Sequence, residues 1–138
     1  MGNSNTQCLL CNGGTETHDH LFFHCPFSKL IWDSIALKCN INTAAIPWES
    51  RICQMVGICS GKSLSSSIKK LCLAATIYSI WNERNKRFHD GSLREAKMVT
   101  WDIIELVRYR LMSSKNIQDN EENRSIQLEW RLPESVFA

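Results

Sequence analysis

Long apolar runs are missing from this chain of 138 residues. The longest, 71–81, is interrupted by Thr76, Tyr78 and Ser79, whereas a helix that spans a bilayer needs about 20 apolar residues. The first residues, MGNSNTQC, also lack the basic segment and apolar core of a secretion signal. We therefore predict a globular protein without a membrane partner, located inside the cell, in the nucleus or the cytoplasm.

Catalytic motifs are missing as well. The sequence has no glycine-rich phosphate loop, no nucleophile elbow, and no paired carboxylates of the kind that two-metal nucleases and polymerases need. Asp33, Asp90 and Asp102 stand alone in the sequence. We predict that the chain is not an enzyme and takes no small-molecule substrate.

Cysteine, in contrast, is abundant. Seven cysteines is an odd number, and without an export signal we expect reduced thiols rather than a disulfide framework. Four of them lie among Ile, Val, Leu and Ala residues, which predicts small buried apolar side chains: Cys39, Cys53, Cys59 and Cys72. The other three lie within residues 8–25, together with three histidines.

The segment 8–25, CLLCNGGTETHDHLFFHC, has the composition of a zinc site. Structural zinc takes four Cys and His ligands in a tetrahedron, usually as two pairs separated by a loop. Cys8-x2-Cys11 supplies the first pair, and the Asn-Gly-Gly that follows suits a tight turn with positive φ whose N–H groups reach the thiolates. Four good ligands leave no vacancy, so we predict a closed structural site.

The second pair of ligands has to come from the three histidines and Cys25. His24 is adjacent to Cys25, and neighbouring side chains of an extended segment point to opposite sides. His20-x4-Cys25 has a normal ligand spacing, and His18 is the alternative to His20. Pro26 favours the start of a helix, whose positive end favours a thiolate at Cys25. We therefore predict Zn²⁺ bound by Cys8, Cys11, His20 and Cys25.

Two stretches of the sequence resemble a known family. The Cys-x2-Cys pair followed by ET-x-DHLFFHCPFSKLIW, which ends at Trp32, resembles the zinc-binding domain downstream of the reverse transcriptase in plant non-LTR (LINE-type) retrotransposons. The run LAATIYSIWNERNKRFH, residues 73–89, resembles the next segment of the same polyproteins, where a helix carries a Trp-x-Glu-Arg-Asn motif. The resemblance extends over residues 7–111.

The resemblance implies a zinc-binding accessory domain, derived from a retrotransposon, that associates with nucleic acid and has no catalysis of its own. The metal ligands that it implies are the same four that the spacing predicts. In such polyproteins a polymerase precedes the zinc motif and a ribonuclease H-like segment follows it, and this sequence has neither. We therefore expect a fragment, a pseudogene product or a reused remnant, three alternatives that the sequence leaves open.

Helical periodicity without sustained strand alternation predicts a mainly α fold. Helices are expected over 26–38, 47–56 and 65–88, and a capping box of Ser92 and Glu95 opens a last one that runs to 112. The stripe of the first is Phe27, Leu30, Ile31, Ile35 and Leu37, widened by Trp32. The buried face of the last is Ala96, Val99, Ile103, Leu106 or Val107, and Leu111.

The two long helices are expected to pair as an antiparallel hairpin joined by a turn of three or four residues. Beyond them the composition changes. Ile126, Leu128, Trp130 and Leu132 alternate with polar residues, which predicts a short extended segment. We predict three regions: a CCHC zinc motif with its following helix at 1–39, packed on a small helical bundle at 40–114, and a polar, partly disordered tail at 115–138.

Positive charge is concentrated in the middle of the chain. Residues 62–115 carry a net charge of +6, against −1 before them and −3 after them. A zinc ion with three thiolates is itself negative, so the zinc motif is not the obvious phosphate binder. The candidates for contact with RNA or DNA are the basic residues of the two long helices: Arg84, Lys86, Arg87, Arg108, Arg110, and Lys115 just beyond.

These basic residues have a second interpretation as a solvated polar face, in which Glu83 and Arg87 pair along the helix. Arg84 likewise has two. In the first, Arg84, Trp81 and Phe88 stack on bases of a single strand. In the second, the two rings belong to the core and Arg84 binds loop carbonyls. We favour the second interpretation. The sequence thus supports two functions: a zinc-binding accessory domain that binds nucleic acid, or a zinc-stapled helical scaffold or protein-interaction module without affinity for nucleic acid.

Overall fold

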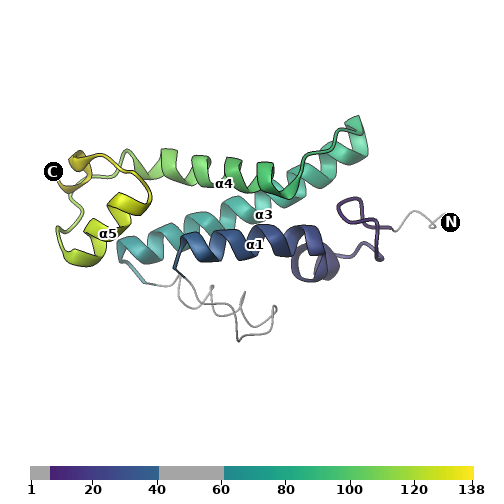
Figure 1. Cartoon of the computed structure of the whole chain (residues 1–138), viewed down its shortest axis with the longest axis horizontal. Coiled ribbons are helices and arrows are strands. Elements are labelled where there is room, and N and C mark those ends of the chain that lie inside the picture. Colours follow the sequence, from purple (N-terminus) through teal and green to yellow (C-terminus); the bar gives the residue numbers. More distant parts are fainter. Residues whose placement is uncertain (1–6, 41–60) are drawn as a thin grey trace.

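The structure, a computed structural model, describes residues 7–40 and 61–138. Three helices run side by side as an elongated bundle (Figure 1): α1 (Pro26–Lys38), α3 (Leu64–Asp90) and α4 (Ala96–Leu111). The predicted mainly α fold is confirmed, and the described part of the chain has no β-strand, only a single bridge between Gln7 and Thr15. None of the described helices combines the length and the apolarity that a bilayer span requires. The helix predicted over 47–56 lies outside the described residues.

Helix α1 begins as the sequence predicts, with Cys25 as N-cap and Pro26 in the first turn. Its buried side is Ser28, Ile31, Trp32, Ile35 and Ala36. The predicted stripe was wrong at two positions, because Leu30 and Leu37 are exposed. Both lie about 100° around the helix from the buried line that faces α3 and α4.

Helix α3 is the longest element and begins where the Ser63 hydroxyl accepts a hydrogen bond from the N–H of Ser66. It ends at Gly91, whose φ of 69° is the left-handed conformation of a helix C-cap. The antiparallel hairpin of α3 and α4 is confirmed. Helix α3 is apolar on the buried side only, however, since Ile77, Tyr78 and Trp81 are exposed.

The predicted capping box is wrong. Glu95 itself is the N-cap of α4, and its side chain makes no capping bond. The connection between α3 and α4 is therefore five residues long, from Gly91 to Glu95. Two contacts to α3 hold this turn extended: the Arg94 N–H donates to Glu83, and the Arg94 carbonyl accepts from Arg87. On α4, Val107 rather than Leu106 faces the core.

The tail folds back onto the bundle at the end opposite the N-terminus (Figure 1). Residues predicted to be extended form instead a helix, α5 (Glu121–Glu129), which Asn120 caps, and a short 3₁₀ turn, η3 (Glu134–Phe137), follows it. Trp130, Leu132 and Val136 are buried in the common core. The Arg108 guanidinium fixes this return by donating hydrogen bonds of 3.0 Å to the carbonyls of Trp130 and Arg131.

The helical tail makes a prediction that an extended one does not. An extended segment places Leu128 and Trp130 on the same side, whereas the structure leaves Leu128 72% exposed and Trp130 only 2% exposed. Trp130→Ala should therefore lower the free energy of unfolding by about 3–5 kcal/mol, while Leu128→Ala should leave it nearly unchanged. Urea denaturation of both variants measures this difference, and equal losses would show that the tail does not dock as a helix.

Candidate metal centre

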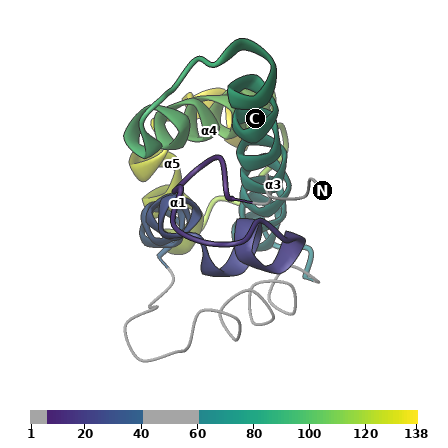
Figure 2. The same cartoon turned by 90° about the vertical axis from the view of Figure 1, so that its right-hand side faces the viewer.

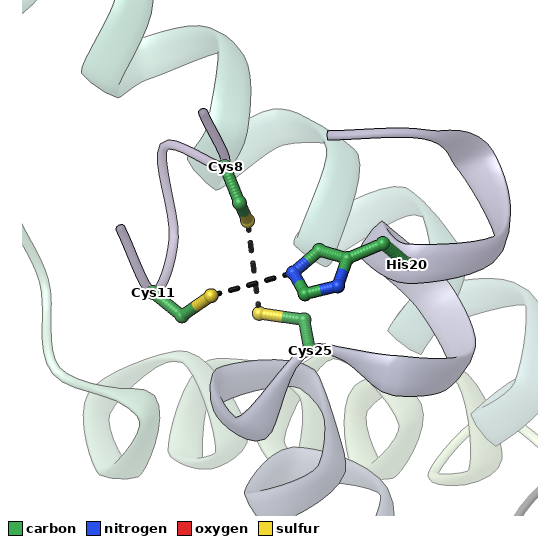
Figure 3. Close-up of side chains that lie close together, drawn as sticks. All are labelled: Cys8, Cys11, His20 and Cys25. Atoms are coloured by element: carbon green, nitrogen blue, oxygen red, sulfur yellow. Dashed lines mark hydrogen bonds between the residues drawn. The ribbon is translucent and has the colours of Figure 1, made fainter. Parts of the chain in front are cut away.

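Four side chains near the N-terminus converge on one point (Figure 3). The Sγ atoms of Cys8 and Cys25 are 3.8 Å apart, and Cys11 Sγ lies 3.3 Å from His20 Nε2. All four ligand atoms lie within 4.8 Å of one another. A zinc ion about 2.3 Å from each sulfur of a tetrahedral site implies an S···S separation of about 3.8 Å. The predicted set of Cys8, Cys11, His20 and Cys25 thus has the spacing that a tetrahedral ion requires.

A tight loop positions the first pair of ligands. The Asn12 N–H donates to the Cys8 carbonyl at 2.8 Å, and the Cys8 N–H donates to the Gly14 carbonyl at 2.7 Å. The Leu10 and Gly13 N–H groups each lie 3.4 Å from a thiol sulfur, of Cys8 and Cys11 respectively. The predicted turn is confirmed, although its positive φ of 58° falls on Asn12 rather than on a glycine. Such N–H···S contacts stabilise thiolates and orient metal ligands.

A π-helical turn, η2 (His20–His24), positions the second pair. The Cys25 N–H donates to the His20 carbonyl at 2.6 Å, and this i→i+5 bond brings the two residues to the same side of the turn. The Thr17 hydroxyl accepts from the His20 N–H at 3.0 Å. The alternative ligand, His18, is exposed and packs edge-on against Trp81 with ring centroids 6.2 Å apart. The structure therefore selects His20.

Gly14 has a role that the sequence does not reveal. A Cβ atom at this position would lie 3.0 Å from His20 Cε1 and 3.4 Å from His20 Nδ1. A side chain there has to displace the imidazole, whose orientation sets the direction of the metal bond. Sequence reasoning assigned Gly14 to the turn only, and the close approach becomes visible once His20 is placed above it.

Burial determines the protonation of the metal-free cluster. Cys8 and Cys25 are fully buried, and this desolvation raises the pKa of the Cys8 thiol and raises the pKa of the Cys25 thiol to about 12. Without a cation the two are neutral thiols at pH 7. A divalent ion that favours sulfur, such as Zn²⁺, stabilises the thiolates directly and displaces their protons. The residues present therefore fit zinc.

The run 73–89 of α3, in which Arg87 follows the Trp-x-Glu-Arg-Asn motif by two residues, holds residues 8–14, the zinc loop, in place. Arg87 donates to the carbonyls of Leu9 and Leu10, both at 3.0 Å, and its Nε bonds Glu83 at 2.9 Å. The predicted pair of Glu83 and Arg87 is confirmed. Figure 2, which views the bundle along its length, shows the N-terminal loop lying across the ends of α1 and α3. The two stretches that carried the family resemblance thus meet in space.

Arg84 takes a different place from the one we favoured. It pairs with Glu16 at 2.8 Å, and the other Glu16 oxygen accepts from the Leu9 N–H at 3.2 Å. Loop carbonyls are bound by Arg87 instead of Arg84. Trp81 and Phe88 are exposed rather than core, and the Arg84 guanidinium packs on both rings.

The remaining basic candidates differ in whether their side chains bind other groups of the protein. Arg108 binds the tail carbonyls and Glu105. Lys86 and Arg110 form no ion pair with any described residue. Contact of these residues with nucleic acid stays a prediction.

The Gly14 contact predicts the effect of a single methyl group. Gly14→Ala should weaken zinc binding by about 10- to 100-fold, the range for changes that disturb the support of a metal ligand. Gly13→Ala is the matched control, because its Cβ would meet only Cys11 atoms at 3.7 and 3.8 Å, which is ordinary contact. Competition with a chromophoric chelator measures both affinities. Equal affinities of the two variants would contradict the placement of His20.

The raised thiol pKa values predict that zinc binding releases protons. At pH 7 the buried thiols of Cys8 and Cys25 carry protons in the metal-free protein and none in the complex, so at least about two protons should be released per zinc. Calorimetric titration in buffers of different ionisation enthalpy counts them, and zinc affinity should rise with pH.

The stability of the metal-free protein should depend on pH in the opposite direction and fall as pH rises. The raised pKa of Cys25 stabilises the fold below about pH 9, the pKa of an unfolded thiol, and this contribution is lost as pH rises toward 12.

Comparison with known proteins agrees with this geometry. Residues 1–32 match the family described as zinc-binding in reverse transcriptase. No curated protein and no solved structure matches the chain. The matched range includes all four candidate ligands and ends in α1, at Trp32. Residues 1–32 are thus similar to the zinc-binding segment of reverse transcriptases.

Proposed function

We propose that the chain is a zinc-stabilised accessory module, derived from a plant retrotransposon reverse transcriptase, that binds single-stranded nucleic acid and catalyses no reaction. It works inside the cell, where its thiols stay reduced. Four protein ligands close the coordination sphere of the metal, which supports a structural rather than a catalytic role for the ion. The observation that carries the proposal of nucleic-acid binding is an exposed face of α3 beside the metal centre.

This aromatic face consists of Ile77, Tyr78, Trp81, Arg84 and Phe88. Spacings of three and four residues put these side chains on one side of the helix. Tyr78 is 64% exposed, Trp81 41% and Phe88 62%. A hollow of ≈ 440 Å³ opens beside them, lined by His18, Phe22, Ile77, Tyr78 and Trp81.

The chemistry of the aromatic face suits unpaired bases. Bases of single strands stack on aromatic rings and on the planes of guanidinium groups. The Arg84 guanidinium carbon lies 5.5 Å from the centre of the Trp81 ring and 5.3 Å from that of Phe88, so three flat groups adjoin along the helix. Lys70 lies about three turns before Trp81 on the same side of α3. It is exposed and forms no ion pair with any described residue, so it is available to a phosphate.

A second candidate function, a protein-interaction scaffold, is favoured by a separate surface. Helices α1 and α4 enclose a hollow of ≈ 290 Å³ whose lining includes Leu30, Trp101 and Ile104. Leu30 and Trp101 are each 62% exposed. Exposed apolar side chains that line a hollow are a common feature of protein-binding surfaces.

The two candidate functions are distinguished by alanine variants of the two exposed surfaces. We expect the zinc-loaded protein to bind a fluorescein-labelled 12-nucleotide RNA or DNA strand at low salt, with affinity that falls as salt rises. The double variant Tyr78→Ala/Trp81→Ala should weaken binding at least about tenfold, because one stacked base contributes about 1–3 kcal/mol. Trp101→Ala, which removes one large exposed ring from the other surface, should leave it unchanged. Fluorescence anisotropy measures all three affinities.

Zinc content and circular dichroism of each variant establish that it is folded. No binding to either strand at low salt would reject the nucleic-acid proposal and leave the scaffold. Binding that only Trp101→Ala weakens would move the nucleic-acid site to the surface between α1 and α4, and the aromatic face would then have no part in it.

A further inference from the structure

A second pair of thiols meets far from the metal centre. Cys39 caps the C-terminus of α1, and Cys72 lies in the first half of α3. Both were predicted to be small buried side chains, and their burial is confirmed. Burial alone does not explain their position, because the two Sγ atoms lie 3.5 Å apart in hydrogen-bond contact.

Cys39 also borders a cavity. A pocket of ≈ 450 Å³ lies between the end of α1, the start of α3 and α5. Its lining includes Lys38, Cys39, Ile68, Lys69, Glu129 and Trp130. Cys39 lines the pocket, whereas Cys72 is fully buried and does not line it.

The surroundings of Cys39 favour its thiolate. The hydrogen bond with Cys72 lowers the pKa of the Cys39 thiol, and the charges of Lys69 and Lys38 lower it further. Of these two lysines, Lys38 is partly neutralised by Glu129, whose carboxylate is 3.7 Å away, while Lys69 forms no ion pair with a described residue. Thiolates, not thiols, are the nucleophiles of cysteine chemistry.

We propose that Cys39 and Cys72 form an oxidisable dithiol that reacts with a hydroperoxide through the pocket. The Cys39 thiolate attacks the terminal peroxide oxygen, so an S–O bond forms, the O–O bond breaks, and the leaving alkoxide or hydroxide takes up a proton. The Cys72 thiol then attacks the sulfenic sulfur. The S–S bond forms, the S–O bond breaks, and the Cys72 proton leaves with the hydroxyl as water. Two electrons pass from the two thiols to the peroxide.

The resulting disulfide ties the end of α1 to α3. Bond formation brings the sulfurs from 3.5 Å to about 2.05 Å, a movement of about 1.5 Å. A crosslink between residues 39 and 72 removes freedom from the unfolded chain, so the oxidised form should be the more heat-stable one. A zinc ion bound at the metal centre would hold the thiolates of Cys8, Cys11 and Cys25, so the peptide that carries Cys53 and Cys59 is the competitor that the test has to distinguish.

Tryptic mapping tests the proposal on the full zinc-loaded chain. Trypsin separates Cys39 in peptide 39–51, Cys72 in peptide 71–84, and Cys53 with Cys59 in peptide 52–62. After treatment with one equivalent of hydrogen peroxide and blocking of free thiols, we expect peptides 39–51 and 71–84 joined, two hydrogen masses below their sum. The zinc should be retained, and the melting temperature should rise until dithiothreitol reverses the change.

Two variants make the test specific. Cys39→Ser should abolish both the linked peptide and the rise in melting temperature. Lys69→Met, which keeps both thiols, should slow linkage by about three- to tenfold because the thiolate fraction falls. Three results would overturn the proposal: linkage of Cys39 to peptide 52–62, zinc loss before any linkage of 39–51 to 71–84, or no linkage at a tenfold excess of peroxide.

Discussion

The buried ion pair of Glu83 and Arg87 is the interaction on which the position of the metal centre depends. Glu83 is 2% exposed, so its carboxylate needs a cation, and Arg87 supplies one from the next turn of the same helix. The remaining donors of the guanidinium are then directed away from α3. They donate hydrogen bonds to the carbonyls of Leu9 and Leu10 in the zinc loop and to the carbonyl of Arg94 in the turn before α4. The plane of the guanidinium packs on the ring of Phe27 in α1.

A metal ion bound at the site and this guanidinium would order the same short loop by different means. Residues 8–14 have no helix or strand to satisfy their carbonyls, and buried backbone groups need partners. Arg87 satisfies two of them, and a metal ion bound by Cys8 and Cys11 would fix the side chains of these two residues. The charge of Arg87 is already balanced by Glu83. The guanidinium therefore acts on the loop through its hydrogen bonds, and the two contributions hold different groups of the same segment.

Local patterns made most of the site predictable, and contacts distant in sequence did not. The ligands follow from two short spacings, so Cys8, Cys11 and Cys25 could be assigned without a fold, with His20 preferred and His18 left as its alternative. The role of Gly14 depends on where the His20 ring lies, and the choice between Arg84 and Arg87 depends on a loop more than 70 residues away. The prediction of an extended segment in the tail was wrong for another reason. Ile126 and Trp130 are four residues apart, a spacing that places two side chains on one side of an extended strand and equally on one side of a helix.

The basic middle of the sequence shows why charge counting overstates a binding surface. Residues 62–115 carry a net charge of +6, yet three of their guanidinium groups bind other parts of the protein. Arg84 pairs with Glu16, Arg87 binds loop carbonyls, and Arg108 binds the tail. On the aromatic face of α3, the guanidinium that contacts the exposed rings, that of Arg84, is the one paired with Glu16. Phosphate contacts dominate the affinity of duplex-binding proteins, whereas stacking on aromatic rings requires unpaired bases. A face rich in rings and poor in free cations is therefore better matched to a single strand than to a duplex.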